Sequence, residues 1–473
     1  MGHGHHIEIK QEQYTFSPKT KRFTIILMVL GLVLAGIGIA NLNNDSHSTA
    51  TEHKTEANAN VHDSHGKDAS AHGDHAAAAS HDEPAEHGNV PNEQFGPRAE
   101  YHSLNKPATT RIFANLLVAG YFFLMISLAA LFWYAIQYVA NAGWSAAIKR
   151  VPEAVMTFIP VPLIVILVVL FLDKNNIYHW AHYEHLHLKP EDAGYDKILD
   201  GKSGFLNSTL LFAFPAILVT IWYLLSRKLR SLSIQEDSAS KGDVSFFKKS
   251  IRYSATFAVI FGFTISIIVW LLIMSVDSHW YSTIFGIYNF ITHWVSAITI
   301  MAIIILYLKK EGYFGIVTAE HMHDLGKFMF AFTVFWAYVW LSQYLLIWYA
   351  QIPEEMYYYQ IRWEEYHYNF IINFALCFCV PFLGLLMRSA KRNPVVMTVI
   401  GIILILGHYH DVWFMVFPGV FGPGMQIGLL EIGTFLFFSG VFLFWVFTAL
   451  TKRGLIAVNH PYLEESVYHD TGV

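Results

Sequence analysis

The chain has 473 residues, of which 54% are hydrophobic, 16% are aromatic and only 14% are charged. Soluble proteins average about 25% charged residues, so this composition excludes an ordinary soluble protein. The formal net charge of −5 includes no basic arm or acidic tail, which excludes nucleic acid as a partner. Cys377 and Cys379 form no CxxC or CxxCH motif, so iron–sulfur, structural zinc and covalent c-type haem sites in this chain are unsupported.

The apolar residues fall in separate runs of about 18 to 28 residues, the length that crosses a hydrocarbon core of about 30 Å. Backbone groups that face lipid must be hydrogen-bonded within their own segment, and no alternating barrel pattern is present. The sequence therefore predicts an all-α polytopic membrane protein with about ten transmembrane helices. The expected spans are Phe23 to Ala40, Ile112 to Val139, Val155 to Leu172, Leu206 to Leu225, Tyr253 to Met274, Ile284 to Leu308, Phe328 to Tyr349, Tyr368 to Leu386, Val395 to Val416 and Gln426 to Leu450.

Lys and Arg in the short links predict the orientation of these spans. The pairs Lys149-Arg150 and Lys309-Lys310 and the run Arg388 to Arg392 alternate with links that carry almost no positive charge. Because positive residues concentrate on the cytoplasmic side, both termini are expected in the cytoplasm. The protein is then a multi-pass protein of the bacterial inner membrane.

The expected organisation has four parts. Residues 1–41 form a cytoplasmic N-terminus and the first span, which is favoured as an uncleaved anchor over a secretory signal. Residues 42–110 form a His-rich, flexible tether on the outer face, for which a solvated linker is favoured over a zinc or copper site. Residues 111–452 form the helical membrane domain, and residues 453–473 form a cytoplasmic tail.

Titratable groups inside the spans are rare, and each costs at least about 2.5 kcal/mol on insertion scales. His408 and Asp411 lie three residues apart in span nine, on one helical face where they can share a hydrogen bond or a proton. Glu431 in span ten and His293 in span six lie at similar estimated depths. These four residues are the candidate proton path, and the competing interpretation is that they are hydrogen-bonded packing residues.

Polar residues also gather where spans leave the membrane. Asp277 and His279 stand in a short link between spans five and six, where they can contact a quinol or cap helix ends. His179, His182 and His185 would align on one face of a helix, for metal binding or for docking a partner. At the other side of the membrane, Glu153 and the residues around Glu320 are expected to be solvated loop and N-cap groups rather than a proton entrance.

Two stretches carry a resemblance to a known family: DSHWYSTIFGIYNF at residues 277–290 and DLGKFMFAFTVFWAYVWLSQYLLIWYAQIPEE at residues 324–355. They resemble the NrfD-like membrane subunits of bacterial alternative complex III, a quinol:cytochrome c oxidoreductase, and are more similar to the ActF type than to the ActC type. The resemblance covers spans two to ten.

This resemblance implies two four-helix bundles with flanking helices and no haem or cluster bound by this chain. It implies a subunit that supports quinol oxidation and proton translocation or release through polar half-channels. Asp277, His279, Gln343 and Tyr344 match family motifs and would be quinone or rim contacts. The implied partners are a paralogous NrfD-like subunit, a multihaem cytochrome c subunit, an iron–sulfur subunit, a monohaem cytochrome c and a haem–copper terminal oxidase, with membrane lipid around them. Haem c and iron–sulfur clusters would belong to those partners, and quinol would be the substrate of the complex.

Two other functions stay open from the sequence. A secondary transporter of a small polar solute or ion would be expected to have paired helix breaks in matching halves. Pro160, Pro162 and Pro215 interrupt spans without such pairing. A b-type haem protein could use His293 and His408 as axial ligands.

Overall fold

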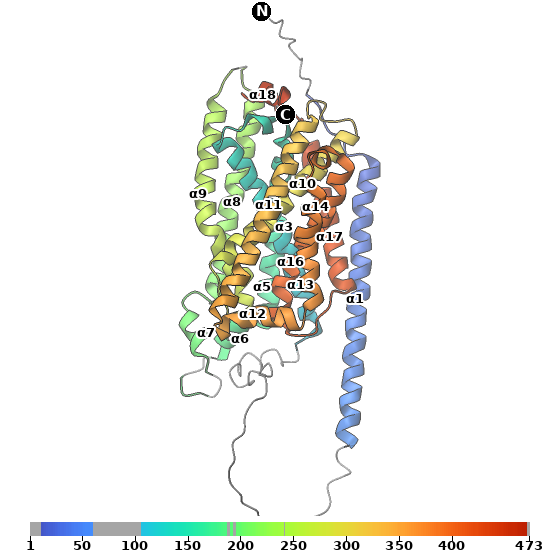
Figure 1. Ribbon diagram of the computed structural model, residues 1–473, viewed down its shortest axis with the longest axis vertical. Helices are drawn as coiled ribbons and strands as arrows, with labels where there is room; N and C mark the ends of the chain where they lie inside the picture. The colour runs from blue at the N-terminus through green and yellow to red at the C-terminus, as the bar shows by residue number, and fades with distance from the viewer. Residues whose placement is uncertain (1–10, 60–105, 187–189, 193–194, 241, 471–473) are drawn as a thin grey trace, which may run out of the picture.

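The chain folds as an all-α polytopic membrane protein (Figure 1), seen in a computed structural model that describes residues 11–59, 106–186, 190–192, 195–240 and 242–470. Ten helices in these residues are long and apolar enough to cross a membrane, as the sequence predicts. Each expected span corresponds to one of them. The membrane-crossing elements are α1 (Pro18–Ala59), α3 (Ala108–Val139), α5 (Pro160–Ile177) with α4 (Arg150–Val155) and η3 (Met156–Phe158), α8 (Ser208–Asp237), α9 (Ser245–Leu272) with η4 (Met274–Val276), α10 (Ile284–Lys310), α11 (Ala319–Ala350), α13 (His367–Phe374) with η5 (Ala375–Cys379) and α14 (Val380–Leu385), α16 (Pro394–Phe421) and α17 (Leu429–Thr451).

Short helices connect the spans at the two ends of the molecule. One end holds η2 (Gly143–Ile148), α15 (Arg388–Arg392) and α18 (Leu463–Val467), together with the Lys and Arg pairs of the short links, and we call it the basic end. The opposite end holds α6 (His179–Leu186), α7 (Lys197–Lys202) and α12 (Pro353–Glu364). Residues 11–17 and the tail after α17 meet at the basic end, where the Leu455 amide donates to the Glu12 carbonyl at 2.7 Å.

The helices form two four-helix bundles, as the family resemblance implies. In the first bundle α3, α5, α8 and α9 contact one another in a closed ring. In the second bundle α10, α11, α16 and the span formed by α13, η5 and α14 do the same. The bundles join where α10 packs against α3 and α9, and where α16 packs against α3. Helix α3 is therefore the most deeply buried span, with 89% of its apolar window inside the protein.

Helix α1 lies outside both bundles and is held almost entirely by α17 (Figure 1). Glycines allow the two backbones to touch: a Cβ at Gly433 would lie 2.4 Å from the Ala35 amide nitrogen, and one at Gly31 would lie 2.4 Å from that of Phe437. Small residues commonly bring membrane helices together in this way. Helix α1 continues to Ala59, beyond the expected end of the first span at Ala40. The rest of the predicted tether, residues 60–105, lies outside the described residues.

Replacing Gly433 with Leu should detach α1 from the bundles, because the new side chain would occupy the position of the α1 backbone. Gly36→Leu is the matched control, since a Cβ at Gly36 meets nothing within 4 Å. With a protease site inserted between residues 60 and 105, cleaved α1 should co-purify with the tagged remainder of the wild-type and Gly36→Leu proteins. It should be lost from Gly433→Leu, and its retention there would contradict the proposed packing.

Candidate functional site

A carboxylate lies inside the second bundle, where four of its helices meet. Asp411 of α16 is fully buried, at 0% exposure. From α10, the Tyr288 hydroxyl donates to Asp411 Oδ1, and Thr292 Oγ1 donates to Oδ2 at 3.0 Å. Trp336 Nε1 of α11 donates to Oδ2 at 3.2 Å, and Asn373 Nδ2 of α13 donates to Oδ1 at 2.8 Å. We call these five residues the Asp411 centre.

The local structure of the helices explains how these donors converge. Tyr288 and Thr292 are four residues apart, so they lie on one face of α10. Asn373 comes just before the π-helix η5, a form of helix that is frequent at functional sites. Cys377 of η5 lies 3.6 Å from Asn373 Oδ1. The Asp411 centre thus combines groups from all four spans of the second bundle, with two of them from α10 and Asn373 from the span that continues through η5 into α14.

His408 and His293 are buried nearby and take no part in these hydrogen bonds. His293 Nδ1 lies 2.7 Å from the Asn289 carbonyl oxygen. His293 Nε2 and both ring nitrogens of His408 have no hydrogen-bond partner in the described part of the chain. The His408 ring lies 5.9 Å from that of Trp336. The expected hydrogen bond between His408 and Asp411 is not formed, because donors from neighbouring helices surround the carboxylate.

A second histidine on α16 connects to the centre through an amide. His410 Nδ1 lies 3.3 Å from Asn373 Oδ1, and His410 Nε2 lies 3.1 Å from Asn369 Oδ1. Asn369 is half-buried, so this branch leads from Asp411 toward the outside of α13. His410 is therefore linked to Asp411 through a single residue, Asn373, which contacts both side chains.

Glu431 sits in a different setting. It accepts two hydrogen bonds from Arg111, at 2.8 Å from Nε and 3.0 Å from Nη2, and one from Asn115 at 3.0 Å. It also accepts from the Gly428 amide at 2.7 Å, which caps the first turn of α17. These contacts tie α17 to α3. Glu431 shares no hydrogen-bond partner with the Asp411 centre among the described residues.

Asp277 belongs to a buried ion pair near the opposite end. Arg362 of α12 donates from Nη2 to Asp277 Oδ2 at 3.1 Å, and the two side chains are 2% and 3% exposed. Arg362 also donates to the carbonyls of Phe414 and Met415 on α16, at 3.2 and 3.0 Å. Its guanidinium lies 3.4 Å above the Tyr358 ring. The ion pair therefore joins α12 and the link after η4 to α16 one turn beyond Asp411.

The other three residues that were predicted to contact a quinone or the rim lie in two separate places. Gln343 of α11 hydrogen-bonds to Tyr359, and the Tyr344 ring lies 5.2 Å from the same tyrosine ring. His279 instead forms an ion pair with Asp196, which caps α7. The His279 ring also lies 5.5 Å from that of His179 in α6. His182 belongs to the same helix, whereas the side chain of His185 and all of His187 lie outside the described residues.

A mostly apolar cavity of about 380 Å³ opens beside this rim. Ser278 and Trp280, the neighbours of His279, line it together with Trp270 and Lys202. Trp280 stacks on Tyr358 with ring centroids 3.9 Å apart. None of the four predicted rim contacts lines this cavity, but Trp280 connects it to the Arg362 ion pair.

Buried charges also occupy the basic end of the first bundle. Lys149 pairs with Glu236 at 2.7 Å, and Arg150 pairs with Glu153 at 2.6 Å and with Asp237. These five residues form the basic-end network. Glu153 is only 3% exposed, so the expectation of a solvated group there is wrong. His321 is not solvated either, at 0% exposure, but it does lie in the first turn of α11, where it forms a capping box with the N-cap residue Thr318.

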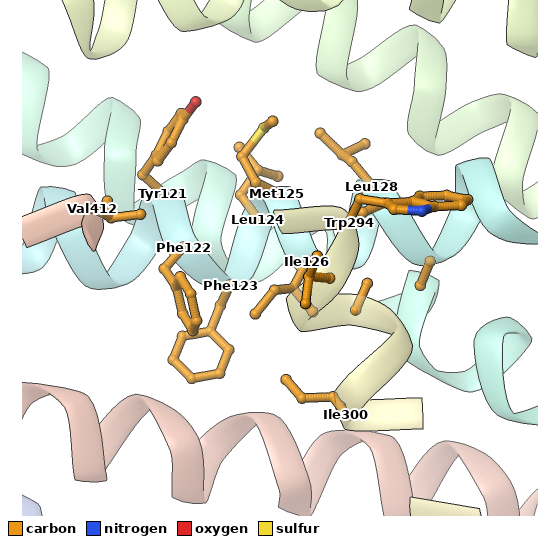
Figure 2. Close-up of a cluster of buried hydrophobic side chains, with 14 of the residues drawn as sticks. Tyr121, Phe122, Phe123, Leu124, Met125, Ile126, Leu128, Trp294, Ile300 and Val412 are labelled. Carbon is orange, nitrogen blue, oxygen red and sulfur yellow. The ribbon is translucent and has the colours of Figure 1, made fainter. Parts of the chain in front are cut away.

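Mostly apolar side chains of α3, with Ser127 among them, lie between the depths of the Asp411 centre and the basic-end network. Helix α3 contributes Tyr121 near the Asp411 centre and Tyr134 near the basic-end network, about 20 Å apart along the helix. Leu124, Met125 and Leu128 lie between them and are buried with Trp294 (Figure 2). The two polar regions are therefore distinct sites.

The described residues contain no group of three or more His, Cys, Asp or Glu side chains placed to hold a metal ion. His293 packs against the rings of Tyr121 and Phe122 at 5.3 and 5.8 Å. A haem between His293 and His408 would have to displace such aromatic contacts.

Searches of protein-family models and of curated proteins find no match for the chain.

Substituting Asp277 with Asn should destabilise the protein by about 3 kcal/mol, because Arg362 would keep its charge in a buried place. Glu320→Gln is the control, since its pair with Arg392 is partly exposed and should be worth less than about 1 kcal/mol. Thermal unfolding of the detergent-solubilised variants measures both. Equal effects would contradict the distinction between the two pairs.

The pair of Asp196 and His279 should make the thermal stability of the protein depend on pH in the acidic range. Burial raises the pKa of Asp196, but the hydrogen bond and charge of His279 and the amides of Leu199 and Ile198 lower it to about 2, from an ordinary value of 3.8. A lowered carboxyl pKa contributes stability above pH of about 4, and this contribution is lost as the pH falls toward 2. His279→Gln should therefore lose less thermal stability than wild type between pH 5 and pH 3. The control His367→Gln, at the same end, should behave as wild type.

Proposed function

We propose that this chain is a cofactor-free membrane subunit of a respiratory quinol:cytochrome c oxidoreductase of the alternative complex III type. Its Asp411 centre passes protons that quinol oxidation releases. The observation that carries the proposal is the fully buried Asp411, which receives hydrogen bonds from three other helices of its bundle.

The partners of Asp411 distinguish it from two other buried carboxylates, Glu431 and Asp277. Glu431 is paired with Arg111, and Asp277 is paired with Arg362. If either gained a proton, a cation would remain without its partner, which is costly in a low-dielectric interior. The hydrogen-bond donors to Asp411 are all neutral, so Asp411 can gain or lose a proton without leaving a buried cation. Intramembrane titratable groups of this kind commonly belong to proton relays.

A route from Asp411 toward the opposite end is supported by successive contacts. Arg362 bonds to carbonyls of α16 one turn from Asp411, and Tyr358 lies between Arg362 and Trp280. Trp280 lines the cavity of about 380 Å³, whose apolar wall with a few polar atoms is typical of a small-molecule site. A quinol ring in this cavity would lie beside the aromatic side chains that lead to Asp411.

The mostly apolar stretch of α3 in Figure 2 supports our proposal of proton release on one side of the membrane. Leu124, Met125 and Leu128 offer no group that could accept a proton between the Asp411 centre and the basic-end network. Positive residues favour the cytoplasmic side, so the basic end faces the cytoplasm in our proposal and the route from Asp411 leads outward. The multihaem, monohaem and iron–sulfur partners, the paralogous subunit and the terminal oxidase rest on the family resemblance.

The test is Asp411→Asn in the native membrane complex. Quinol-dependent cytochrome c reduction and the accompanying proton release should fall by at least about tenfold, because Asn cannot exchange a proton and proton-transfer groups typically contribute 10²- to 10⁴-fold. Asp324→Asn, at the basic end and paired with Lys327 and His469, should retain activity.

Native gels with mass spectrometry and haem staining must first show that both variants comigrate with multihaem c and iron–sulfur subunits. Unchanged turnover and proton release in a fully assembled Asp411→Asn complex would refute the role of Asp411. Migration of the wild-type chain without those subunits would refute the complex itself and favour a transporter.

A further inference from the structure

A large cavity at the basic end lies far from the Asp411 centre. It has a volume of about 770 Å³ and lies between α8 and α17, with Met156 and Thr157 of η3 also lining it. This volume is within the range of about 300–1,000 Å³ that is usual for small-molecule sites. Helix α1 packs on α17 at Gly433 and Gly440, and neither of these glycines lines the cavity.

The charges in this cavity are all positive. Arg227 and Arg230 of α8 line it with Lys452 and Arg453 at the end of α17, and no Asp or Glu side chain is among its lining residues. None of the four forms an ion pair within the described part of the chain. Arg230 donates to the Ala449 carbonyl at 3.4 Å, and Arg227 lies 6.0 Å from the Tyr223 ring centroid. This differs from the basic-end network, where Lys149 and Arg150 are neutralised by carboxylates.

Along α8, the residues that lead to the cavity change from apolar to polar. On α8, the exposed residues Ile217, Ile221 and Leu224 follow the helical period, and the same face continues into Arg227 and Ser231 at the cavity. An apolar stripe that faces lipid therefore leads directly to the cationic cavity.

An aromatic side chain marks the other wall of the cavity. Trp445 of α17 is 42% exposed, and its Nε1 donates to Thr157 Oγ1 at 3.2 Å. Tryptophan at this depth is typical of the boundary between acyl chains and headgroups. Both walls thus change from apolar to polar at the level where lipid headgroups lie.

We propose that this cavity is a binding site for an anionic phospholipid of the leaflet at the basic end. The phosphate and any further headgroup charge bind among Arg227, Arg230, Lys452 and Arg453, and the acyl chains lie along the stripe of Ile221 and Leu224. Basic pockets between transmembrane helices bind acidic lipid headgroups in this way. An apolar helix of a partner subunit would not satisfy four unpaired cations.

The test uses the purified full-length chain after delipidation in detergent. Phosphatidylglycerol and cardiolipin should raise the melting temperature and appear as bound adducts in native mass spectra, whereas phosphatidylcholine should do neither. Arg230→Gln combined with Arg453→Gln should weaken the response to anionic lipid at least tenfold in lipid concentration. Lys248→Gln combined with Lys249→Gln, two exposed cations at the start of α9 outside the cavity, should respond as wild type.

Ser231→Glu provides a second variant that should not disturb folding, because Ser231 is exposed and lines the cavity. It should weaken binding of anionic lipid by placing a negative charge among the cations. An equal response to phosphatidylcholine, or to glycerol phosphate without acyl chains, would overturn the assignment to an anionic phospholipid. Unchanged lipid binding in both cavity variants would also overturn it. The assignment would equally fail if the wild-type protein did not respond to lipid and the region around Trp445 crosslinked to a partner protein instead.

Discussion

The structure depends on how polar groups are satisfied where no water can reach them. A buried charge in a medium of low dielectric is tolerated only when a counter-charge or several hydrogen bonds compensate it. Near the opposite end this chain uses both solutions. Arg111 and Arg362 neutralise Glu431 and Asp277, whereas neutral donors from three helices surround Asp411.

These two solutions have different mechanical and chemical consequences. The ion pairs link elements that are distant in sequence, because Arg111 joins α3 to α17 and Arg362 joins α12 to α16. They hold the ends of helices in register and resist a change in protonation. The neutral shell of Asp411 positions the carboxylate without fixing its charge. The same interior thus contains carboxylates held by buried cations, Glu431 and Asp277, and one held by neutral donors, Asp411.

The sequence predicted the membrane spans well because the hydrophobic length of a span is a local property. The position of Asp411 within a span was likewise predictable from the apolar run around it. Its partners were not, because Thr292, Trp336 and Asn373 are neutral and lie in apolar runs where such residues usually serve packing. The pairing of Arg362 with Asp277 connects residues 85 positions apart, which helical spacing cannot show. Arg362 still carried one usable signal, since it is the sole Lys or Arg in its link between two spans.

At the basic end, too, contacts between helices could not be predicted from the sequence. Glu153 resembles a solvated residue at the start of a helix when only its neighbours in sequence are considered. Its partner Ser233 comes from α8, at 2.5 Å, and together with Arg150 it removes Glu153 from solvent. Lys149 and Arg150 are neutralised internally, whereas the four cations that line the α8–α17 cavity form no ion pair among the described residues. The internal ion pairs therefore determine which positive charges at this end have no carboxylate partner within the described part of the chain.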